Sequence, residues 1–536
     1  MTELYRTDHR HIIKRIIVRG ILVLDTPTCL GQGDTDSPTD LPLLRDSLHE
    51  NYALLTGSSI AGSLRNYLRE RDKGYDQSDR RNDLAAKLFG DLFAYKDEKD
   101  KNESEKIKLR EHDNQSLIII DDAISTKPIK AELRDGVKIN SATGTAEDKA
   151  KYDLELLQAG TEFPLSFELL IDKNNDEATL LKALAIALSG LEPKEDQNDS
   201  ECQNDSKSGE ISLGMKKRRG FGRCHVKEWQ VWSFNLEDSG DRTSWLNFEH
   251  WRTGIILIFN TYSSITEAFE KAEIKLDING EDKRERFVIH AKFQLVGSLL
   301  IRSGQDSTGR APDVVHLKSH RNNELKPVLS GTSLAGVLRH RAERIVNTLH
   351  EINPQITQEI VNDIFGFVKD KKESQQLEAN KANKKPEAKA SRLIVHEKVI
   401  KNATELVQNR IAIDRFTGGA YHGALFDEQP IFGGAQTIVS IELELRNPKE
   451  HEIGLLLLLL KDLWTSDLPV GGESSIGRGR LQGTETTLTL YRSQHKETWT
   501  ITQVGEDKLQ ISAPDQLQTF VQALVDYSQK EVKNDA

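Results

Sequence analysis

Two short glycine-rich segments carry the strongest chemical signal in the sequence. The first reads Gly-Met-Lys-Lys-Arg-Arg-Gly-Phe-Gly-Arg over residues 214–223, and the second extends from Gly471 to Arg480. Closely spaced glycines allow backbone N–H groups to approach a phosphate, and adjoining Lys and Arg side chains supply positive charge. Each segment is therefore predicted to hold a nucleic-acid backbone. A hairpin turn with solvated arginines is the alternative for one segment alone, and the presence of two matching segments favours phosphate binding.

The overall charge of the chain is an objection to nucleic-acid binding. The 536 residues include 73 Lys and Arg against 84 Asp and Glu, a formal net charge of −11, whereas binding to phosphates depends on cations that displace counterions. The charges are segregated, however. Acidic residues gather in stretches such as 192–210, and residues 216–219 form a basic run. We therefore expect the affinity to reside in local basic loops.

Length and hydrophobic pattern indicate a soluble protein with about two large domains. No run of about 18 apolar residues occurs, so no membrane contact is expected. The first 14 residues have no apolar core of the kind that marks a secretory signal. Cys29, Cys202 and Cys224 show no CxxC spacing, which argues against a disulfide framework and a zinc site. A reducing, cytoplasmic location is expected.

The glycine-rich segments belong to a longer internal repeat. Gly-Ser-Ser-Ile-Ala-Gly at residues 57–62 matches Gly-Thr-Ser-Leu-Ala-Gly at 331–336, an offset of 274 residues (331 − 57). Leu-Phe-Gly ending at Gly90 matches Ile-Phe-Gly ending at Gly366, an offset of 276 (366 − 90). The Thr-Gly that ends at Gly144 matches the one that ends at Gly418. These ordered matches indicate two tandem copies of one unit.

Each copy is predicted to contain the same order of strands and helices. An apolar first strand, at residues 16–24 and 287–301, leads through a polar loop to an amphipathic helix that opens at the small-residue turn. The remaining strands are expected at 117–120 and 163–171 in the first copy and at 393–395 and 437–445 in the second, with helices at 179–188 and 454–463. This order fits a β-α-β-β-α-β plan with long insertions.

The repeat also sets the expected domain boundaries. At the glycine-rich segments the offset falls to 257 residues (477 − 220), a shortfall of 17 (274 − 257). The polar segment 193–209 is about that size and has no counterpart in the second copy, so we interpret it as a disordered insertion. Residues 277–286 are mostly polar and are predicted to link a first domain, residues 1–276, to a second domain, residues 287–536.

Four motifs together resemble a known family. They are the segment at 214–223, the Gly-Ser-Ser-aliphatic-x-Gly turn at Gly57, Leu-Phe-Gly at Leu88, and Ile-Asp-Arg-x-Thr-Gly at 413–418 followed by Ala-Leu-Phe. In these the chain resembles the RAMP superfamily, and within it the backbone subunits of type III CRISPR–Cas effectors. The resemblance implies an α+β chain of two tandem ferredoxin-like domains, a modified RNA-recognition fold, with thumb hairpins. A fused double module points to a type III-D-like complex.

The resemblance implies a catalytic aspartate in the loop after the first strand. The family setting, Asp-x-Pro-aliphatic-aliphatic-Arg-Asp, matches residues 40–46 position by position and assigns that role to Asp40. Asp313 keeps the aspartate and a basic residue five places later but lacks the proline. A shift of register by one short motif would select Asp36 instead, and simple solvation of these acidic residues is the plain alternative.

One carboxylate per site, with substrate phosphates completing the coordination shell, suits Mg²⁺ or Mn²⁺. Such an ion neutralises developing charge and lowers the pKa of bound water. Asp40 and Asp313 are therefore also the predicted metal ligands.

The predicted RNA-binding residues lie in the glycine-rich segments, in the turns that open the first helices, and at the tip of the second hairpin. They are Gly214, Lys216, Lys217, Arg218, Arg219, Gly220, Gly222, Arg223, Gly471, Gly472, Gly477, Arg478, Gly479, Arg480, Ser58, Ser59, Thr332, Ser333 and Phe416.

The stretches 137–157 and 413–426 correspond to the thumbs, which in the family push between guide and target. Phe416, Tyr421 and Phe426 are expected to stack on bases. Burial in the core is the alternative for Phe416 and Phe426. The first thumb departs from the family, with Asn140 and Ser141 in place of Asp and Arg.

The sequence thus predicts a double backbone subunit that binds crRNA and cleaves paired target RNA within a hetero-oligomeric ribonucleoprotein. Two alternatives stay open. One is a non-catalytic, guide-binding scaffold of the same complex, and the other is a metal-independent guide-processing endoribonuclease that uses His as acid or base. The sequence does not decide whether both copies cleave, which guide positions each covers, which subunits flank the chain, or the exact subtype.

Overall fold

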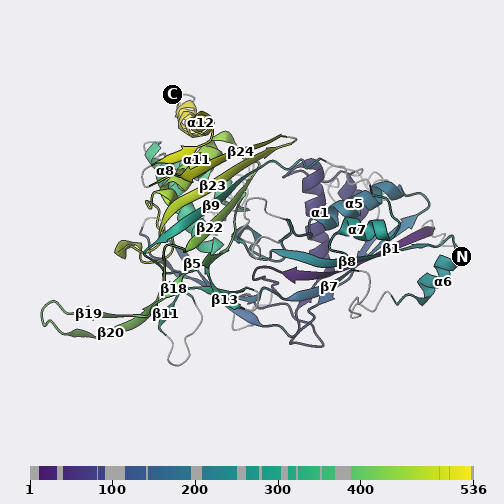
Figure 1. Cartoon of the computed structure of the whole chain (residues 1–536), viewed down its shortest axis with the longest axis horizontal. Helices are drawn as coiled ribbons and strands as arrows, with labels where there is room; N and C mark the ends of the chain where they lie inside the picture. The colour runs from purple at the N-terminus through teal and green to yellow at the C-terminus, as the bar shows by residue number, and fades with distance from the viewer. Residues whose placement is uncertain are drawn as a thin grey trace, which may run out of the picture.

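The computed structural model describes most of the chain, and the statements below concern the described residues: 11–32, 40–80, 83–90, 115–140, 143–194, 208–249, 261–276, 281–303, 312–321, 324–349, 353–368, 388–493, 495–505 and 508–532. Two bodies lie side by side (Figure 1). One hydrophobic core draws its residues from positions 16–274 and another from positions 287–524. Each copy of the repeat therefore has a core of its own.

The first copy is organised around β1 (Ile12–Leu24). This strand pairs antiparallel with β7 (Glu162–Asp172) on one side and with β8 (Cys224–Asn235) on the other. The short strand β3 (Ile118–Ile120) pairs with the outer edge of β7, which gives the sheet order β3-β7-β1-β8. Side chains alternate between the two faces of a strand, and Ile16, Val18, Leu22 and Leu24 of β1 are buried against the helices.

Helices cover one face of this sheet. The helix α1 (Gly57–Lys73) begins after Thr56, whose side chain accepts a hydrogen bond from the Ser59 backbone N–H. Its buried residues, Ile60, Leu64, Tyr67 and Leu68, recur at helical spacing. The helix α5 (Glu177–Ser189) is apolar on most sides because it packs against α1, α2 (Leu84–Phe89) and α7 (Ile265–Lys271).

The second copy repeats this plan. Its central strand β9 (Arg286–Val296) lies between β22 (Ile438–Arg446) and β23 (Arg480–Arg492), and β16 (Leu393–Val395) pairs with β22. The helices are α8 (Gly331–Leu349), α9 (Pro354–Phe365) and α11 (Glu450–Trp464). All strands and helices predicted for the two plans are present within a few residues of the expected positions.

Additional strands, α9 and the C-terminal helix extend the second copy beyond the predicted plan. Its sheet continues through β24 (His495–Gln503) and β25 (Leu509–Ile511), and on the other side through β17 (Lys398–Lys401), β13 (Glu324–Leu329) and β12 (Lys318–Arg321). The C-terminal helix α12 (Pro514–Val532) packs along α11 and buries Leu517, Phe520 and Leu524. A Cβ at Gly454 of α11 would lie 2.2 Å from the Phe520 carbonyl oxygen, so this glycine permits the close approach.

Both predicted thumbs are hairpins. In the first copy β5 (Ala131–Ile139) pairs with β6 (Ala146–Leu157), and in the second β19 (Gln408–Ile413) pairs with β20 (Ala420–Gln429). The β19–β20 hairpin projects from the body at the lower left of Figure 1. Phe416 at its tip is 99% exposed, so burial of this ring in the core, the alternative considered above, is wrong.

The first glycine-rich segment is enclosed by the second copy. Its short helix η2 (Lys217–Arg219) lies against β16 and the start of α8. Gly220 has a φ of +85°, and a Cβ there would lie 2.3 Å from the Glu397 backbone nitrogen. A Cβ at Gly331 would lie 2.4 Å from the Arg219 carbonyl oxygen. Both contacts join the two copies, and each requires a glycine.

A buried group of ion pairs also joins the copies. Arg134 of β5 donates to Glu397 of the second copy through Nη1 (2.8 Å) and Nη2 (3.2 Å), and its Nε donates to Glu132 (2.7 Å). Arg321 pairs with the same Glu397 at 2.7 Å. All four side chains are at most 7% exposed.

Three regions named in the sequence predictions lie partly or wholly outside the described residues: Asp36, most of the segment 193–209, and residues 277–280 of the linker. In the described part of the linker Arg284 is 4% exposed and donates to Glu210 of the first copy at 2.8 Å. None of the helices in the described part of the chain is long and apolar enough to cross a membrane.

Candidate nucleic-acid interface and catalytic aspartates

The first glycine-rich segment folds as one tight turn on the loop that follows β1. Met215 N–H donates to the Cys29 carbonyl (2.9 Å), and Leu213 N–H donates to the Gly222 carbonyl (2.8 Å). Gly214, Gly220 and Gly222 all have positive φ, and a Cβ at Gly222 would lie only 1.8 Å from the Leu213 carbonyl oxygen. Glycine is therefore needed for the backbone path, and this path presents residues 216–219 as a single basic turn.

The basic side chains of this turn have no described carboxylate as an ion-pair partner. Lys216 lies over the Tyr152 ring, with Nζ 3.8 Å from the ring centroid. Burial lowers the pKa of Lys217 and of Arg219, and it lowers the pKa of Arg218 to about 10, with the neighbouring Arg446 acting in the same direction. Cations whose loss of water is not offset by an ion pair attract an anionic ligand.

A groove of about 380 Å³ connects this turn to the start of α1. It is lined by Ser58, Ser59 and Gly62 of the helix and by Gly214 and Lys217 of the turn. Both serines are exposed, and backbone N–H groups at a helix start favour an anion. The structure therefore brings together two predicted sets of RNA-binding residues that are about 150 positions apart in the sequence.

The corresponding turn of α8 has a different environment. Thr332 and Ser333 are half-buried at the helix start, where the preceding Gly331 packs under the Arg219 carbonyl of the first copy. These two predicted residues therefore belong to a helix whose start lies against the first glycine-rich segment.

The second glycine-rich segment keeps the backbone path and loses most of the positive charge. Gly471, Gly477 and Gly479 again have positive φ, but Glu473 and the short helix η3 (Ser474–Ile476) replace the basic run. Arg478, a predicted RNA ligand, is 3% exposed and pairs with Glu428 and with Glu473, each at 2.9 Å. Its charge is balanced inside the protein, whereas Arg480 is exposed.

Asp40 and Asp313 occupy equivalent positions at the bases of the two hairpins. The Asp153 N–H of β6 donates to Asp40 Oδ2 at 2.8 Å, and the Asp427 N–H of β20 donates to Asp313 Oδ2 at 3.0 Å. The two donors are separated by the repeat offset of 274 residues (427 − 153). Both acceptor aspartates are exposed. The same contact thus occurs twice, although only the first copy keeps the full motif.

Asp153 and Asp427 were not among the predicted site residues. Their shared offset is the signal in the sequence that identifies them, because it places an aspartate opposite each candidate catalytic aspartate. The pKa of Asp153 is raised by desolvation and by the neighbouring Asp135. No group of three or more His, Cys, Asp or Glu side chains arranged to hold a metal occurs among the residues that the structure describes.

Each aspartate loop is tied to its hairpin by a second contact, and the two copies use different chemistry. In the first copy Glu155 of β6 pairs with Arg45 and accepts a hydrogen bond from Leu43 N–H at 3.0 Å. In the second copy Glu405 accepts from Lys318 and from Gln429, each at 2.7 Å. Arg45 therefore holds its loop directly against β6. Lys318 reaches β20 through Glu405 of the short strand β18 (Thr404–Glu405), which precedes the hairpin.

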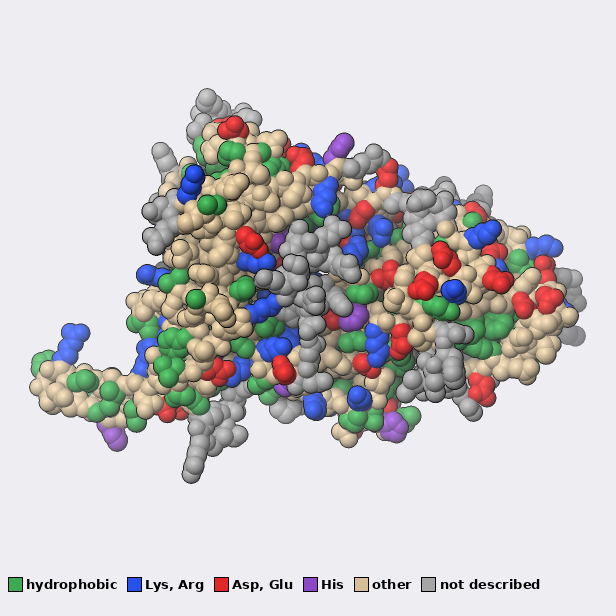
Figure 2. Space-filling model, viewed as in Figure 1, with side chains coloured by type: hydrophobic (Ala, Val, Ile, Leu, Met, Phe, Trp, Pro, Cys, Tyr) green, Lys and Arg blue, Asp and Glu red, His purple; other side chains and the backbone are tan. Residues whose placement is uncertain are grey.

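The β19–β20 hairpin exposes an apolar surface. Phe416, Tyr421 and Leu425 are 99%, 65% and 66% exposed, and the projecting arm in Figure 2 carries several hydrophobic side chains. Its tip is ordered by Asp414, whose carboxylate accepts from the Phe416 N–H at 2.9 Å. Exposed apolar patches of this kind mark interaction sites, and aromatic rings stack readily on bases.

Comparison with known families gives a match to each copy. The sequence model of the RAMP superfamily matches residues 22–225 and 292–482. Each matched range contains one helix-opening turn and one glycine-rich segment. No curated protein matches the chain significantly. Because the two ranges cover most of both copies, the chain belongs to the RAMP superfamily.

Proposed function

We propose that this protein is a double backbone subunit of a type III CRISPR effector, of a III-D-like kind, which binds guide RNA and cleaves the paired target RNA. Membership of the RAMP superfamily suggests a CRISPR-associated subunit that binds RNA. The observation that carries the proposal is the repeated geometry of Asp40 and Asp313, each held by a backbone amide at the base of a hairpin.

The strand order supports a ferredoxin-like fold for each copy. In the first copy the β-α-β-β-α-β strands in chain order are β1, β3, β7 and β8, and in space they lie as β3-β7-β1-β8. The second copy arranges β16, β22, β9 and β23 in the same way. Each therefore has the antiparallel arrangement of a split βαβ unit.

Guide binding is supported by the groove between α1 and the first glycine-rich segment. Lys217 and the N–H groups at the helix start are donors suited to phosphate oxygens. These contacts carry no sequence information, which suits a subunit that must accept many different guides.

Target cleavage is supported by the aspartate geometry. The Asp153 and Asp427 amides each engage one carboxylate oxygen, and the other oxygen of Asp40 and of Asp313 has no partner among the described residues. A hard divalent ion such as Mg²⁺ or Mn²⁺ would supply charge neutralisation and an activated water at such an oxygen. The hairpin fixes the carboxylate while Phe416 and its neighbours hold the target strand apart from the guide.

Partners of the assembly are suggested by the way the copies join. Inside the chain the first glycine-rich segment packs on the start of α8. No described residue covers the matching surfaces at the two ends in this way. Ser58 and Ser59 are exposed, Ile476 is 54% exposed, and a Cβ at Gly477 would meet nothing within 4 Å. We infer that other effector subunits attach at these two ends.

The test is cleavage mapping by the reconstituted complex with single replacements Asp40→Asn and Asp313→Asn. Each should remove one cut and leave guide binding and target pairing unchanged, because a single metal ligand contributes to the transition state and not to the phosphate contacts. Chelation should stop both cuts. Asp135→Asn, an aspartate of the same first hairpin, is the matched control and should cut normally.

Other outcomes select the alternatives. Loss of a cut in Asp36→Asn with normal cutting by Asp40→Asn would move the assignment to Asp36. Absence of any metal-dependent cut in a complex that pairs with its target would identify a scaffold. Cutting of guide precursor that persists in chelator would identify a guide-processing enzyme.

A further inference from the structure

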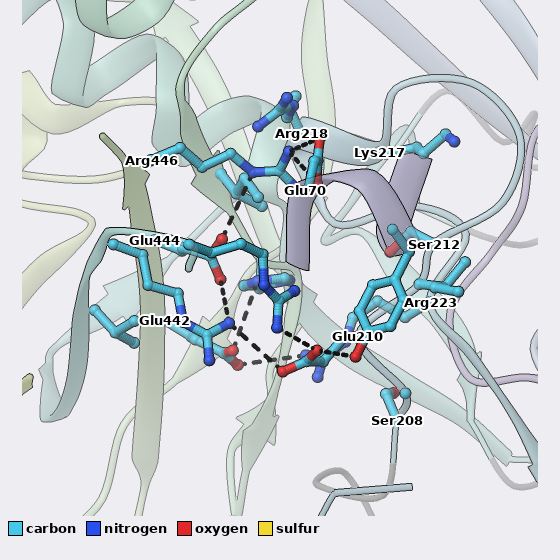
Figure 3. Close-up of a pocket in the computed structure, with 18 of the residues that line it drawn as sticks. Glu70, Ser208, Glu210, Ser212, Lys217, Arg218, Arg223, Glu442, Glu444 and Arg446 are labelled. Carbon is cyan, nitrogen blue, oxygen red and sulfur yellow. Dashed lines mark hydrogen bonds and ion pairs between the residues drawn. The ribbon is translucent and has the colours of Figure 1, made fainter. Parts of the chain in front are cut away.

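A second basic site lies between the two copies, below the first glycine-rich segment. It is a cavity of about 580 Å³ whose walls come from both copies, and Figure 3 shows the charged side chains that surround it. Eight Lys and Arg residues line it against four Glu residues, and no Asp does. The lining therefore has an excess of four formal positive charges (8 − 4) before its histidines are considered.

The four carboxylates are already engaged by other cations. Glu70 accepts from Arg446 at 3.1 and 3.3 Å, and Glu444 lies 3.6 Å from the same guanidinium. Glu442 pairs with Lys398 at 2.6 Å and with Arg223 at 3.3 Å. Figure 3 shows the Glu70, Arg446 and Glu444 contacts as one connected chain.

The fourth carboxylate is paired as well, and one of the two lining histidines, His396, is neutral. Glu210 pairs with Arg284 at 2.8 Å and also accepts from Tyr67. Burial lowers the pKa of His396 to about 4, so this ring is neutral near pH 7 and the charge on Glu442 is balanced by Lys398 and Arg223.

Three lining cations are left without a carboxylate among the described residues: Lys216, Lys217 and Arg218. Lys216 lies over the Tyr152 ring, with Nζ 3.8 Å from the ring centroid. Arg218 Nη1 is buried and has no hydrogen-bond partner there. Lys217 Nζ has only the Ser63 hydroxyl, at 3.4 Å. The half-buried Arg218 guanidinium, with one nitrogen buried and unpartnered, carries a desolvation penalty that an oxyanion relieves. Its planar fork matches two phosphate oxygens.

We propose that the cavity between the copies binds a phosphate group through Arg218 and Lys217. Ser63, Asn66 and Ser212 also line it and offer hydroxyl and amide groups to the remaining oxygens. The site goes beyond the proposed guide groove, although Lys217 lines both. The phosphate comes from one of two sources, a phosphodiester of the bound guide or a free phosphate compound.

Because the walls come from both copies, the bound ligand also stabilises the way they are joined. A ligand that binds only the folded arrangement raises stability by an amount that grows with the logarithm of its concentration relative to its Kd. Arg218 has the opposite effect when the cavity is empty, since an unpaired buried cation is unfavourable.

The experiment uses the full chain, with inorganic pyrophosphate as the probe, titrated by calorimetry at constant ionic strength. Wild type should bind it saturably, and its Tm should rise with pyrophosphate concentration. Arg218→Met should weaken binding by about tenfold or more, the loss expected for a charged hydrogen-bonding partner, and should have an equal or higher Tm without ligand. Arg218→Lys, which keeps the charge, should retain measurable binding.

Control measurements distinguish a guide phosphodiester from a free phosphate compound and show which result would contradict the proposal. Arg492→Met, an exposed arginine of β23 outside the cavity, should bind as wild type does. If the cavity holds a phosphodiester of the guide, a short single-stranded RNA should displace pyrophosphate. If it holds a free phosphate compound, RNA and pyrophosphate should bind at the same time. Equal affinity of wild type and Arg218→Met for pyrophosphate and for RNA would overturn the proposal. This readout needs no cleavage, so it is independent of the proposed catalytic function.

Discussion

Replacing Arg134 by Met should separate the first hairpin from the second copy. The guanidinium of Arg134 makes three hydrogen bonds, two to Glu397 and one to Glu132, and both carboxylates are fully buried. Methionine fills a similar volume but leaves these carboxylates with fewer partners. Removing one member of a buried ion pair costs about 3–5 kcal/mol.

The free-energy cost of this substitution depends on the partners that Glu397 and Glu132 keep. Glu397 keeps Arg321 at 2.7 Å, and Glu132 keeps a hydrogen bond from Ser319 at 3.2 Å. We therefore expect a cost near the lower end, about 3 kcal/mol. If the free energy of local opening falls by this amount, the amide hydrogens of the opened segment exchange about two powers of ten faster.

Hydrogen exchange followed by mass spectrometry, on peptides that contain β5 and β17, measures this opening directly. Lys151→Met is the matched control, because Lys151 pairs with Asp135 in the same hairpin but is 63% exposed. An exposed pair contributes about 0–1 kcal/mol, so the control should exchange at nearly the wild-type rate. Equal protection of the Arg134 and Lys151 variants would refute a buried junction between the copies.

The pH dependence gives a second readout of the same group. Burial raises the pKa of Glu397, but the charges of Arg134 and Arg321 outweigh that effect and hold it below its ordinary value. A depressed carboxylate pKa contributes stability above the unfolded pKa, about 4.3, and that stability is lost as the pH falls through the folded pKa. In Arg134→Met the loss should begin at a higher pH.

Three further predictions concern the hairpins and one buried histidine. Phe416→Ala should leave the Tm unchanged, because the ring is 99% exposed, and should weaken target engagement as measured by pairing with a fluorescent target RNA; a large fall in Tm would contradict this. Arg45→Glu should reduce the first cut more than guide binding, and the added Glu155→Arg should restore it, since the pair joins the Asp40 loop to β6; failure of the double variant to recover would exclude a positioning role. Burial lowers the pKa of His316 to about 4, so unfolding free energy should fall as the pH drops from about 6.5 to 4, and His316→Gln should flatten that dependence in urea titrations.

Much of the architecture could be predicted because it depends on local patterns. The alternation in β1 and the helical spacing of Leu64, Tyr67 and Leu68 are properties of a few consecutive residues, and the structure places them as expected. Because the two copies match at a nearly constant offset, the elements expected in one copy could also be placed in the other. The apolar residues of α12 recur at helical spacing. This helix was not predicted because its sequence has no matching segment in the first copy.

The details of the candidate site depend on contacts between distant positions and could not be predicted. Arg478 pairs with Glu428, which lies 50 positions earlier, and its charge is therefore not available to a phosphate. The Asp153 amide that holds Asp40 lies 113 positions later, and Arg134 meets Glu397 across 263 positions. A glycine-rich motif specifies a backbone path, but the neighbours that balance its charges come from other parts of the fold.

The close packing of Gly220 and Gly331 has a consequence for how such a fused chain changes over evolution. Neither glycine can gain a side chain unless the facing backbone, at Glu397 or at Arg219, retreats. Both positions should therefore stay glycine in relatives whose two copies join in the same way. Exchanging the order of the two copies by genetic engineering should fail for the same reason, since residues 216–219 would then no longer lie against β16 and the start of α8.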